Sequence, residues 1–535
     1  MIFQNLYNKK ELINKLTIKF FFIIFLIVGV FGVKDYGISY DELEYRQQGF
    51  IVLNDLGEKF FPKKTQKIKD DKLLKYPSFD EYFGEIKNNF KIQHTIYAAI
   101  EYLFQKNNNE KKEIYLLRHY LNFFVFFISI FYFYKLSRIF FDRNLSLVGI
   151  LFYFLTPRIF ANSFYNPNDI YFLIFLLISV YYGIYFLKKD KPKHAILLAI
   201  FVSLAFNVRV IGIYFYLIFI FFYIFRNKFL NKNIKSNLLI LQFFLIILFL
   251  YLLTPQLWSN PIYNFFNIFF GQLGYSAINP NVLFMGIMYE GKNLPWYYLI
   301  YWILISSPLI ILTLATVGFG FFLKDYKSIF DYNQNYLILI IIACLICPLF
   351  AFIIFKPIVY NGWRQFYFIW PFILILSIYG LDNLQKIGKR IYLLVNLTVL
   401  LSIIGLCFWN IKNHPYQNTF FNHFARKDSS QFEKDYWGLS NTNALRNILK
   451  KENKEFITIK PLGGSRIDFA INMLTNRERE RIKILKSFSN TNPDYYMTTY
   501  NDGNNFKYYS SDEYLEVESI FVDNFKINTV FKKDF

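Results

Sequence analysis

Long apolar blocks separated by short polar loops dominate the chain. Several of these blocks are long enough to cross a hydrocarbon core about 30 Å thick. Block length and flanking charge together predict about 11 transmembrane helices. We expect them at residues 17–33, 114–134, 145–161, 170–187, 194–207, 210–225, 236–253, 297–322, 335–355, 366–381 and 391–409. The pattern therefore indicates a polytopic α-helical membrane protein.

Segment 194–225 is long for one crossing and short for two. The basic sequences KKDKPKH and RNKFLNKNIK flank it. Loops rich in lysine and arginine stay in the cytoplasm, so both flanks belong on the same side and the number of crossings is even. We therefore predict two short spans, with Arg209 near the turn on the far side.

The N-terminal residues resemble a signal peptide, because a basic stretch precedes an apolar one. No small-x-small cleavage site follows, so we expect an uncleaved first span with a cytoplasmic N-terminus. The far-side segments are then 34–113, the short loop around 162–169, the turn 207–209, the loops 254–296 and 356–365, and everything after 410. In a bacterium the membrane would be the inner membrane and the far side the periplasm.

Two of the predicted far-side segments are long. The first, 34–113, ends in HTIYAAIEYLFQ, whose apolar spacing is typical of an amphipathic helix in the membrane interface. The second, 410–535, contains a helix-like stretch at 440–453 and then strand-like runs such as EFITIK and RIKILK. We predict a transmembrane catalytic domain at 1–409 and a small periplasmic α/β domain at 410–535.

The amino-acid composition agrees with a polytopic membrane protein. Hydrophobic residues make up 55% of the 535 residues and charged residues 18%, and the formal net charge is +21. Most lysines and arginines lie in short loops, where they set orientation, so we expect membrane lipids and no nucleic acid as partners. Cys344 and Cys347 lie three residues apart within an apolar run, and Cys407 lies in another, which favours packing over metal binding.

Unusual polar residues gather on the predicted far side. They are Asp41 and Glu42 after the first span, His94 before the interfacial helix, Arg118 one turn inside the second span, Asn166 and Asp169 in NPND, Arg209 at the next turn, and Arg364 in YNGWRQFYF. Each has an ordinary explanation, since loop carboxylates are solvated, arginines snorkel, and Asn168 or Asp169 could cap a helix. Their convergence at one membrane surface indicates a site.

Several motifs carry a family resemblance. The acidic pair Asp41–Glu42 follows the first span, and NPND occupies 166–169. PQLWSNP, LPWYY and GWRQFYFIWPF follow in order, and HPYQNTFFN and DYWGLS lie after residue 410. In this order the chain resembles the GT-C membrane glycosyltransferases, of the protein O-mannosyltransferase and lipid A aminoarabinose transferase type. The resemblance covers nearly the whole chain.

The resemblance implies transfer of a sugar from a polyprenyl-phosphate donor to a hydroxyl acceptor in the cell envelope. A single carboxylate can take the acceptor's proton, whereas a leaving phosphate needs cations. We expect Asp41 as the base, with Glu42 orienting it or the acceptor, and direct displacement with inversion. Arg364 is the first candidate for the donor phosphate and Arg209 and Arg118 the next. His94, Asn166 and Asp169 would belong to the acceptor side of the active site, where Asp169 could hold the acceptor or steady Arg364.

Metal dependence and the acceptor are separate questions. The first loop lacks the D-x-D with which the metal-dependent oligosaccharyltransferase branch binds a divalent ion, so we expect no cofactor and no required metal. A lipid, a glycan and a protein hydroxyl all remain open as acceptors. The alternative class is a secondary transporter or lipid-sugar flippase, but the spans carry little charge at mid-depth and show no two-fold repeat.

Overall fold

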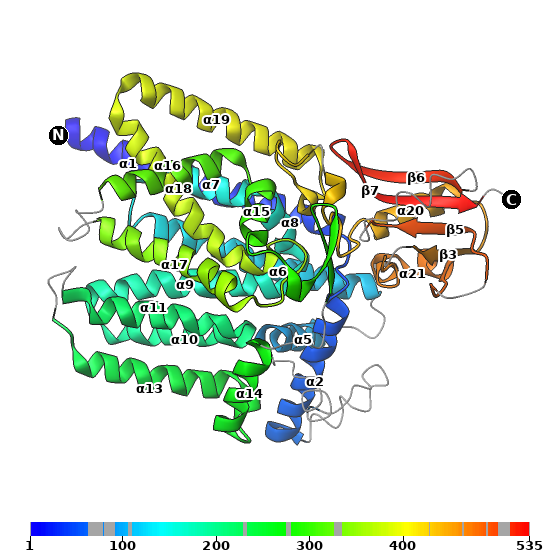
Figure 1. The fold of residues 1–535 in the computed structure, drawn as a ribbon, viewed down its shortest axis with the longest axis horizontal. Coiled ribbons are helices and arrows are strands. Elements are labelled where there is room, and N and C mark those ends of the chain that lie inside the picture. Colours follow the sequence, from blue (N-terminus) through cyan, green and yellow to red (C-terminus); the bar gives the residue numbers. More distant parts are fainter. Residues whose placement is uncertain are drawn as a thin grey trace.

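The computed structural model describes residues 2–62, 79, 91–104, 110–227, 233–273, 280–325, 334–426, 429–462, 465–487, 491–500 and 514–533. A bundle of long helices makes up most of the protein, and the C-terminal strands gather at one end of it (Figure 1). The centre of the lysine-rich first loop, at 63–78 and 80–90, lies outside the described residues.

The helices of the bundle alternate with short connections. The first half contains α1 (Ile2–Gly32), α2 (Glu42–Phe60), α5 (Ile92–Phe104), α6 (Lys111–Ser137), α7 (Arg143–Leu155), α8 (Pro157–Tyr165), α9 (Pro167–Lys189), α10 (Pro192–Val208), α11 (Ile213–Ile224) and α13 (Ser236–Leu253). The second half contains α14 (Pro261–Leu273), α15 (Tyr298–Ser306), α16 (Leu309–Lys324), α17 (Gln334–Phe355), α18 (Trp370–Ile387) and α19 (Lys389–Lys412).

Among the described residues, seven helices are long and apolar enough to cross a membrane, or eight if the bent pair α7–α8 is one span. Three further apolar helices in that part of the chain are shorter: Pro192–Val208, Val210–Ile224 and Leu309–Lys324. The polytopic α-helical fold is thus confirmed, and the count of 11 crossings stays a prediction. Segment 194–225 does contain two helices, and Arg209 lies between them.

Two predicted spans are interrupted by proline. The expected span 145–161 is α7 followed by α8, which begins at Pro157 and is bent by 62° from α7. The expected span 297–322 breaks at Pro308, between α15 and α16. Proline lacks an N–H donor and starts helices well, so it divides an apolar run that hydropathy reads as continuous. The predicted short loop around 162–169 is correspondingly helical as far as Tyr165.

The predicted loop 254–296 contains regular structure. It holds the helix α14 and a hairpin of β1 (Asn281–Phe284) and β2 (Ile287–Glu290). Met285 and Gly286 at the turn both have positive φ, as a two-residue hairpin turn requires. The hairpin is short, and its signal in the sequence is the single Met-Gly pair.

The C-terminal part forms a five-stranded sheet in the order β4-β3-β5-β7-β6. The strands are β3 (Ile457–Pro461), β4 (Ile482–Ile484), β5 (Tyr495–Thr498), β6 (Tyr514–Val522) and β7 (Phe525–Lys533), and α20 (Asn441–Lys451) packs on them. β3 is parallel to both β4 and β5, whereas β7 is antiparallel to β5 and β6. The predicted helix and strand runs all occur here, and the boundary at 410 stays a prediction.

Helices α16 and α18 cross with their backbones almost in contact. A Cβ atom at Gly318 would lie 2.2 Å from the carbonyl oxygen of Leu376, and one at Gly380 would lie 2.1 Å from that of Leu314. Small residues at such crossings let membrane helices approach closely, and packing then holds them together. This crossing supports α18, whose N-terminal end carries part of the site described below.

We expect Gly318→Leu to lower the thermal unfolding temperature of the detergent-solubilised protein, because overpacking of this kind costs about 1–3 kcal/mol. Gly320→Leu is the matched control, since no atom lies within 4 Å of a Cβ at that position. Equal unfolding temperatures for the two variants would show that the α16–α18 crossing is not closely packed.

Candidate active site

The sequence NPND folds into the N-terminal cap of α9. Asn166 is the N-cap, and its Oδ1 accepts a hydrogen bond from the Asp169 backbone N–H at 3.1 Å. Its amide Nδ2 donates to Asp169 Oδ2 at 2.7 Å. The cap is therefore Asn166, not Asn168 or Asp169 as the sequence suggested, because Pro167 occupies the favoured first helical position. This geometry orients the Asp169 carboxylate.

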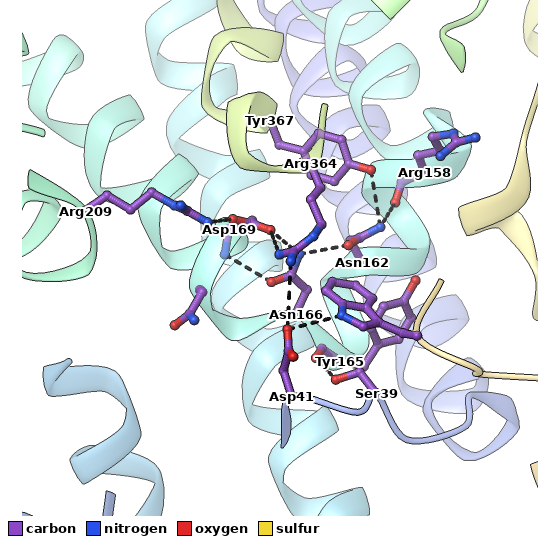
Figure 2. Close-up of polar contacts among 12 residues, drawn as sticks. Ser39, Asp41, Arg158, Asn162, Tyr165, Asn166, Asp169, Arg209, Arg364 and Tyr367 are labelled. Carbon is purple, nitrogen blue, oxygen red and sulfur yellow. Dashed lines mark hydrogen bonds and ion pairs between the residues drawn. The ribbon is translucent and has the colours of Figure 1, made fainter. Parts of the chain in front are cut away.

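Asp169 binds two arginines that come from different parts of the chain (Figure 2). Arg364 Nη1 donates to Asp169 Oδ2 at 2.9 Å, and Arg209 Nη2 pairs with Asp169 Oδ1. The side chains of Asp169 and Arg364 are only 1% and 4% exposed, whereas that of Arg209 is 26% exposed. The Asp169 carboxylate therefore binds two guanidinium groups, and the cluster of these three side chains carries one net positive charge.

Local backbone geometry directs Arg364 into this cluster. Gly362 has a φ of 68°, a conformation that favours glycine, and its N–H donates to the Tyr298 hydroxyl at 3.2 Å. The buried Trp363 then donates from Nε1 to the Ser306 hydroxyl at 2.8 Å. Trp363 is thus an interior anchor. Arg364 begins a 3-10 turn, Arg364–Ile369, that leads into α18.

Asp41 lies beside Arg364. It is the N-terminal cap residue of α2, and its Oδ2 accepts hydrogen bonds from the Tyr45 hydroxyl and the Trp437 indole, each at 3.2 Å. Arg364 Nη2 lies 3.9 Å from the same oxygen. Within the described residues no hydrogen bond reaches Oδ1, and the side chain is 15% exposed. One oxygen is thus held and the other is available.

The environment of Asp41 favours a basic carboxylate. Burial raises the pKa of Asp41 above its ordinary value of 3.8, while Arg364 and the hydrogen bonds from Tyr45 and Trp437 act in the opposite direction. A raised pKa makes the carboxylate a better proton acceptor than an exposed aspartate.

Glu42 turns away from Asp41. Its Oε1 accepts from the Ser39 backbone N–H at 2.6 Å, and its Oε2 lies 2.9 Å from His119 Nε2. Glu42 is 4% exposed. In this structure it therefore braces the loop that carries Asp41, and among the described residues its contacts are with that loop and with α6.

Arg118 belongs to a separate cluster. Its Nε and Nη2 donate to Glu101 Oε2 at 2.8 and 2.6 Å, and Arg46 donates to the other oxygen of Glu101 at 2.7 Å. This cluster joins α2, α5 and α6. The structure thus brings Arg364 and Arg209 to Asp169, but it pairs Arg118 with a different carboxylate.

His94 lies one aromatic ring away from Asp41. It stacks on Tyr45 with ring centroids 4.5 Å apart, and Tyr45 in turn donates to Asp41. Burial, together with Lys91 and Arg118, lowers the pKa of His94 well below 6.5, so the imidazole is neutral at pH 7. Its position is that of a support behind Tyr45.

Sequence reasoning missed two residues that face the cluster. Lys91 interacts electrostatically with Asp169, Asp41 and Arg209, makes no ion pair with any described residue, and has its pKa lowered by burial to about 8. Trp437 contacts both Asp41 and Arg364. Lys91 is one of many lysines in its loop and offered no local signal. Trp437 belongs to the DYWGLS motif, but the sequence did not indicate a contact with Asp41, almost 400 positions away.

Comparisons with known proteins can now be set beside this geometry. Residues 118–258 match the family model described as dolichyl-phosphate-mannose-protein mannosyltransferase. The oligosaccharyltransferase of Archaeoglobus fulgidus, solved tethered to an acceptor peptide, has a TM-score of 0.50 at 10% identity and covers 87% of this chain. This chain covers 64% of that protein's length. The chain has the GT-C fold of membrane glycosyltransferases.

A second solved structure aligns with this chain over nearly the whole length of both proteins. ArnT from Cupriavidus metallidurans, solved with undecaprenyl phosphate, has a TM-score of 0.45 at 10% identity, covering 96% of this chain and 97% of its own. No curated protein sequence matches the chain. The resemblance to GT-C glycosyltransferases that the sequence indicates is confirmed, and so is the predicted fold class.

We expect Asp169→Asn to destabilise the protein, because it leaves Arg364 buried without its carboxylate. Breaking a buried pair costs about 3–5 kcal/mol, and the partial exposure of Arg209 places the loss at the lower end. The measurement is thermal unfolding in detergent. Asp382→Asn, which breaks an exposed pair with Lys386 on α18, is the control and should cost at most about 1 kcal/mol. Equal losses would contradict the central position of Asp169.

Proposed function

We propose that this protein transfers a sugar from a polyprenyl-phosphate donor to a hydroxyl acceptor at the membrane surface. The observation that carries the proposal is the free oxygen of Asp41, which lies next to a cluster with excess positive charge. The match to a dolichyl-phosphate-mannose-dependent family supports the donor class. The basic loops support an inner-membrane protein with a cytoplasmic N-terminus.

Asp41 acts as the general base. Tyr45 and Trp437 hold its Oδ2, so Oδ1 can accept a hydrogen bond from the acceptor hydroxyl. As the acceptor oxygen attacks the anomeric carbon, its proton passes to Oδ1. A positioned carboxylate contributes about 10²–10⁴-fold in rate to such a step.

The arginines receive the leaving group. The bond from the anomeric carbon to the phosphate oxygen breaks, and its electron pair leaves with the polyprenyl phosphate. Arg364 and Arg209 share the charge of Asp169, Arg364 also lies 3.9 Å from Asp41, and the nearby Lys91 makes no ion pair with a described residue. Guanidinium groups bind phosphate oxygens through paired hydrogen bonds, so no acid is required to protonate the leaving oxygen.

Inversion at the anomeric carbon is the stereochemical outcome of the proposed reaction. Attack by the acceptor and departure of the phosphate are one displacement at the anomeric carbon, so the configuration inverts. In such a displacement the acceptor oxygen and the phosphate lie on opposite faces of the anomeric carbon, so the sugar would lie between Asp41 Oδ1 and the arginines; Asp41 Oδ2 and Arg364 Nη2 are 3.9 Å apart. A carboxylate nucleophile on the opposite face, which retention would need, has no part in this scheme.

We expect Asp41→Asn to lower donor turnover by at least about 100-fold, because the amide cannot take a proton. The measurement is release or transfer of radiolabelled sugar from a panel of undecaprenyl-phosphate sugars, beginning with mannose. Asp55→Asn, which lies on the same helix and loses only its pair with Lys59, should keep wild-type turnover. Wild-type turnover by Asp41→Asn would remove Asp41 from the mechanism.

The pH dependence of the wild type should show the same base. Turnover requires the deprotonated carboxylate, so activity is full above the pKa of Asp41 and is lost as pH falls through it. Since burial raises that pKa, the acid limb should lie above pH 3.8. A profile with no acid limb in this region, on a protein that stays folded, would contradict the assignment.

Metal removal tests the role of the cations. We expect EDTA to leave donor turnover unchanged, because arginine and lysine side chains supply the positive charge that a divalent ion gives elsewhere. Loss of activity that Mg²⁺ or Mn²⁺ restores would show that the side chains are not sufficient.

A further inference from the structure

Trp437 contacts both Asp41, the proposed base, and Arg364, the proposed phosphate-binding residue. Its indole Nε1 donates to Asp41 Oδ2 at 3.2 Å, and the guanidinium carbon of Arg364 lies 4.6 Å from its ring centroid. We propose that Trp437, from the C-terminal part of the chain, is a positioning residue that aligns the base and the phosphate-binding arginine. This inference rests on the proposed function.

The backbone around Trp437 is held firmly. Gly438 has a φ of 69°, and a Cβ atom there would lie 2.4 Å from Asn441 Nδ2. The buried carboxylate of Asp435 accepts from the backbone N–H groups of Leu439 at 3.1 Å and Ser440 at 2.8 Å. A turn that needs glycine and a carboxylate that ties the next two residues together give the indole one orientation.

The loop that carries Asp41 docks on the same part of the chain. A Cβ atom at Gly37 would lie 2.2 Å from the Leu439 carbonyl oxygen, so the two backbones are in close contact. Tyr40 packs under Arg466, whose guanidinium carbon lies 3.7 Å from its ring centroid. C-terminal residues thus contact the loop at two positions just before Asp41.

The membrane helices complete the setting of the indole. Tyr165, at the end of α8, meets Trp437 edge to face with centroids 5.4 Å apart. The Tyr165 carbonyl also accepts from the Ser39 hydroxyl at 3.3 Å (Figure 2). Trp437 therefore lies where the first loop, the bundle and the C-terminal part meet, and it is 5% exposed.

The indole hydrogen bond has a chemical consequence at Asp41. It occupies Oδ2 and leaves Oδ1 for the acceptor, and it stabilises the charged carboxylate without itself ionising near neutral pH. The other charged or titratable groups that face Asp41 are Arg364, Asp169, Lys91, Tyr45, Tyr360 and Tyr436. Phenylalanine at position 437 retains all of these groups and keeps an aromatic face beside Arg364, so a shift of the acid limb in that variant reports the lost indole N–H.

The ring face has a separate effect on Arg364. An aromatic face attracts a guanidinium, and Trp437 and Tyr360 both lie within 5.0 Å of the Arg364 guanidinium carbon. A phenylalanine at position 437 keeps a face and loses the N–H donor, whereas a leucine loses both. The two functions of the side chain can therefore be separated by substitution.

The test compares the pH dependence of donor turnover in wild type, Trp437→Phe and Trp437→Leu with undecaprenyl-phosphate sugar as the probe. We expect Trp437→Phe to move the acid limb upward by about half to one pH unit, the effect of one lost hydrogen bond, with the donor KM nearly unchanged. Trp437→Leu should show the same shift and a donor KM raised about threefold to tenfold.

Two further variants keep the test independent of folding. Replacing Trp437 with benzothienylalanine, in which sulfur takes the place of the N–H group, preserves ring size and should reproduce the acid-limb shift of Trp437→Phe. Trp296→Phe, at an exposed tryptophan before α15, should match wild type in both measurements. Thermal unfolding of each variant identifies the temperature range in which all are folded.

The possible results are distinguishable. A wild type that turns over no donor overturns the proposed function, and this inference falls with it. An active wild type whose acid limb coincides with those of Trp437→Phe and the benzothienyl variant overturns the inference alone, because a residue that only packs leaves the limb in place. A shifted limb in both variants, beside an unshifted Trp296→Phe, supports it.

Discussion

The rest of the site depends on the ion pairs that the Asp169 carboxylate makes with Arg209 and Arg364. This carboxylate binds Arg209 from the turn after α10 and Arg364 from the 3-10 turn before α18 at the N-terminal end of α9, where Asn166 orients it. Two guanidinium groups without it would repel each other in a buried setting. Asp169 supplies one negative charge for two guanidinium groups, so these three side chains carry one net positive charge, and Asp41 lies 3.9 Å from Arg364. The anion that we propose for these arginines is a phosphate.

Asp41 gains its character from the same cluster and from the far end of the chain. Arg364 lies on one side of its carboxylate, while Trp437 and Tyr45 hold one oxygen. The C-terminal part thus helps to assemble the site as well as forming a sheet of its own. Glu42 and His119 brace the loop, so the acidic pair after the first span divides into a proposed base, Asp41, and a buried support, Glu42.

The sequence predicted the elements better than their breaks. Hydropathy located the apolar helices, but it does not register Pro157 or Pro308, which divide two runs. Resemblance and clustering selected Asp41, Asp169, Arg209 and Arg364, which the structure brings together. They also selected Arg118, which Glu101 takes into another cluster. The sequence analysis did not select Lys91, and it noted Trp437 only as part of the DYWGLS motif, because both residues reach the site through contacts across the fold that spacing in one sequence does not encode.

The most direct measurement is a cryo-electron microscopy structure of the full chain bound to undecaprenyl phosphate. The proposed mechanism predicts phosphate density within hydrogen-bonding distance of the Arg364 guanidinium, on the side that faces Oδ1 of Asp41. Phosphate density beside Arg118 and Glu101, or anywhere that leaves Arg364 and Asp41 without contact to the lipid headgroup, would contradict it.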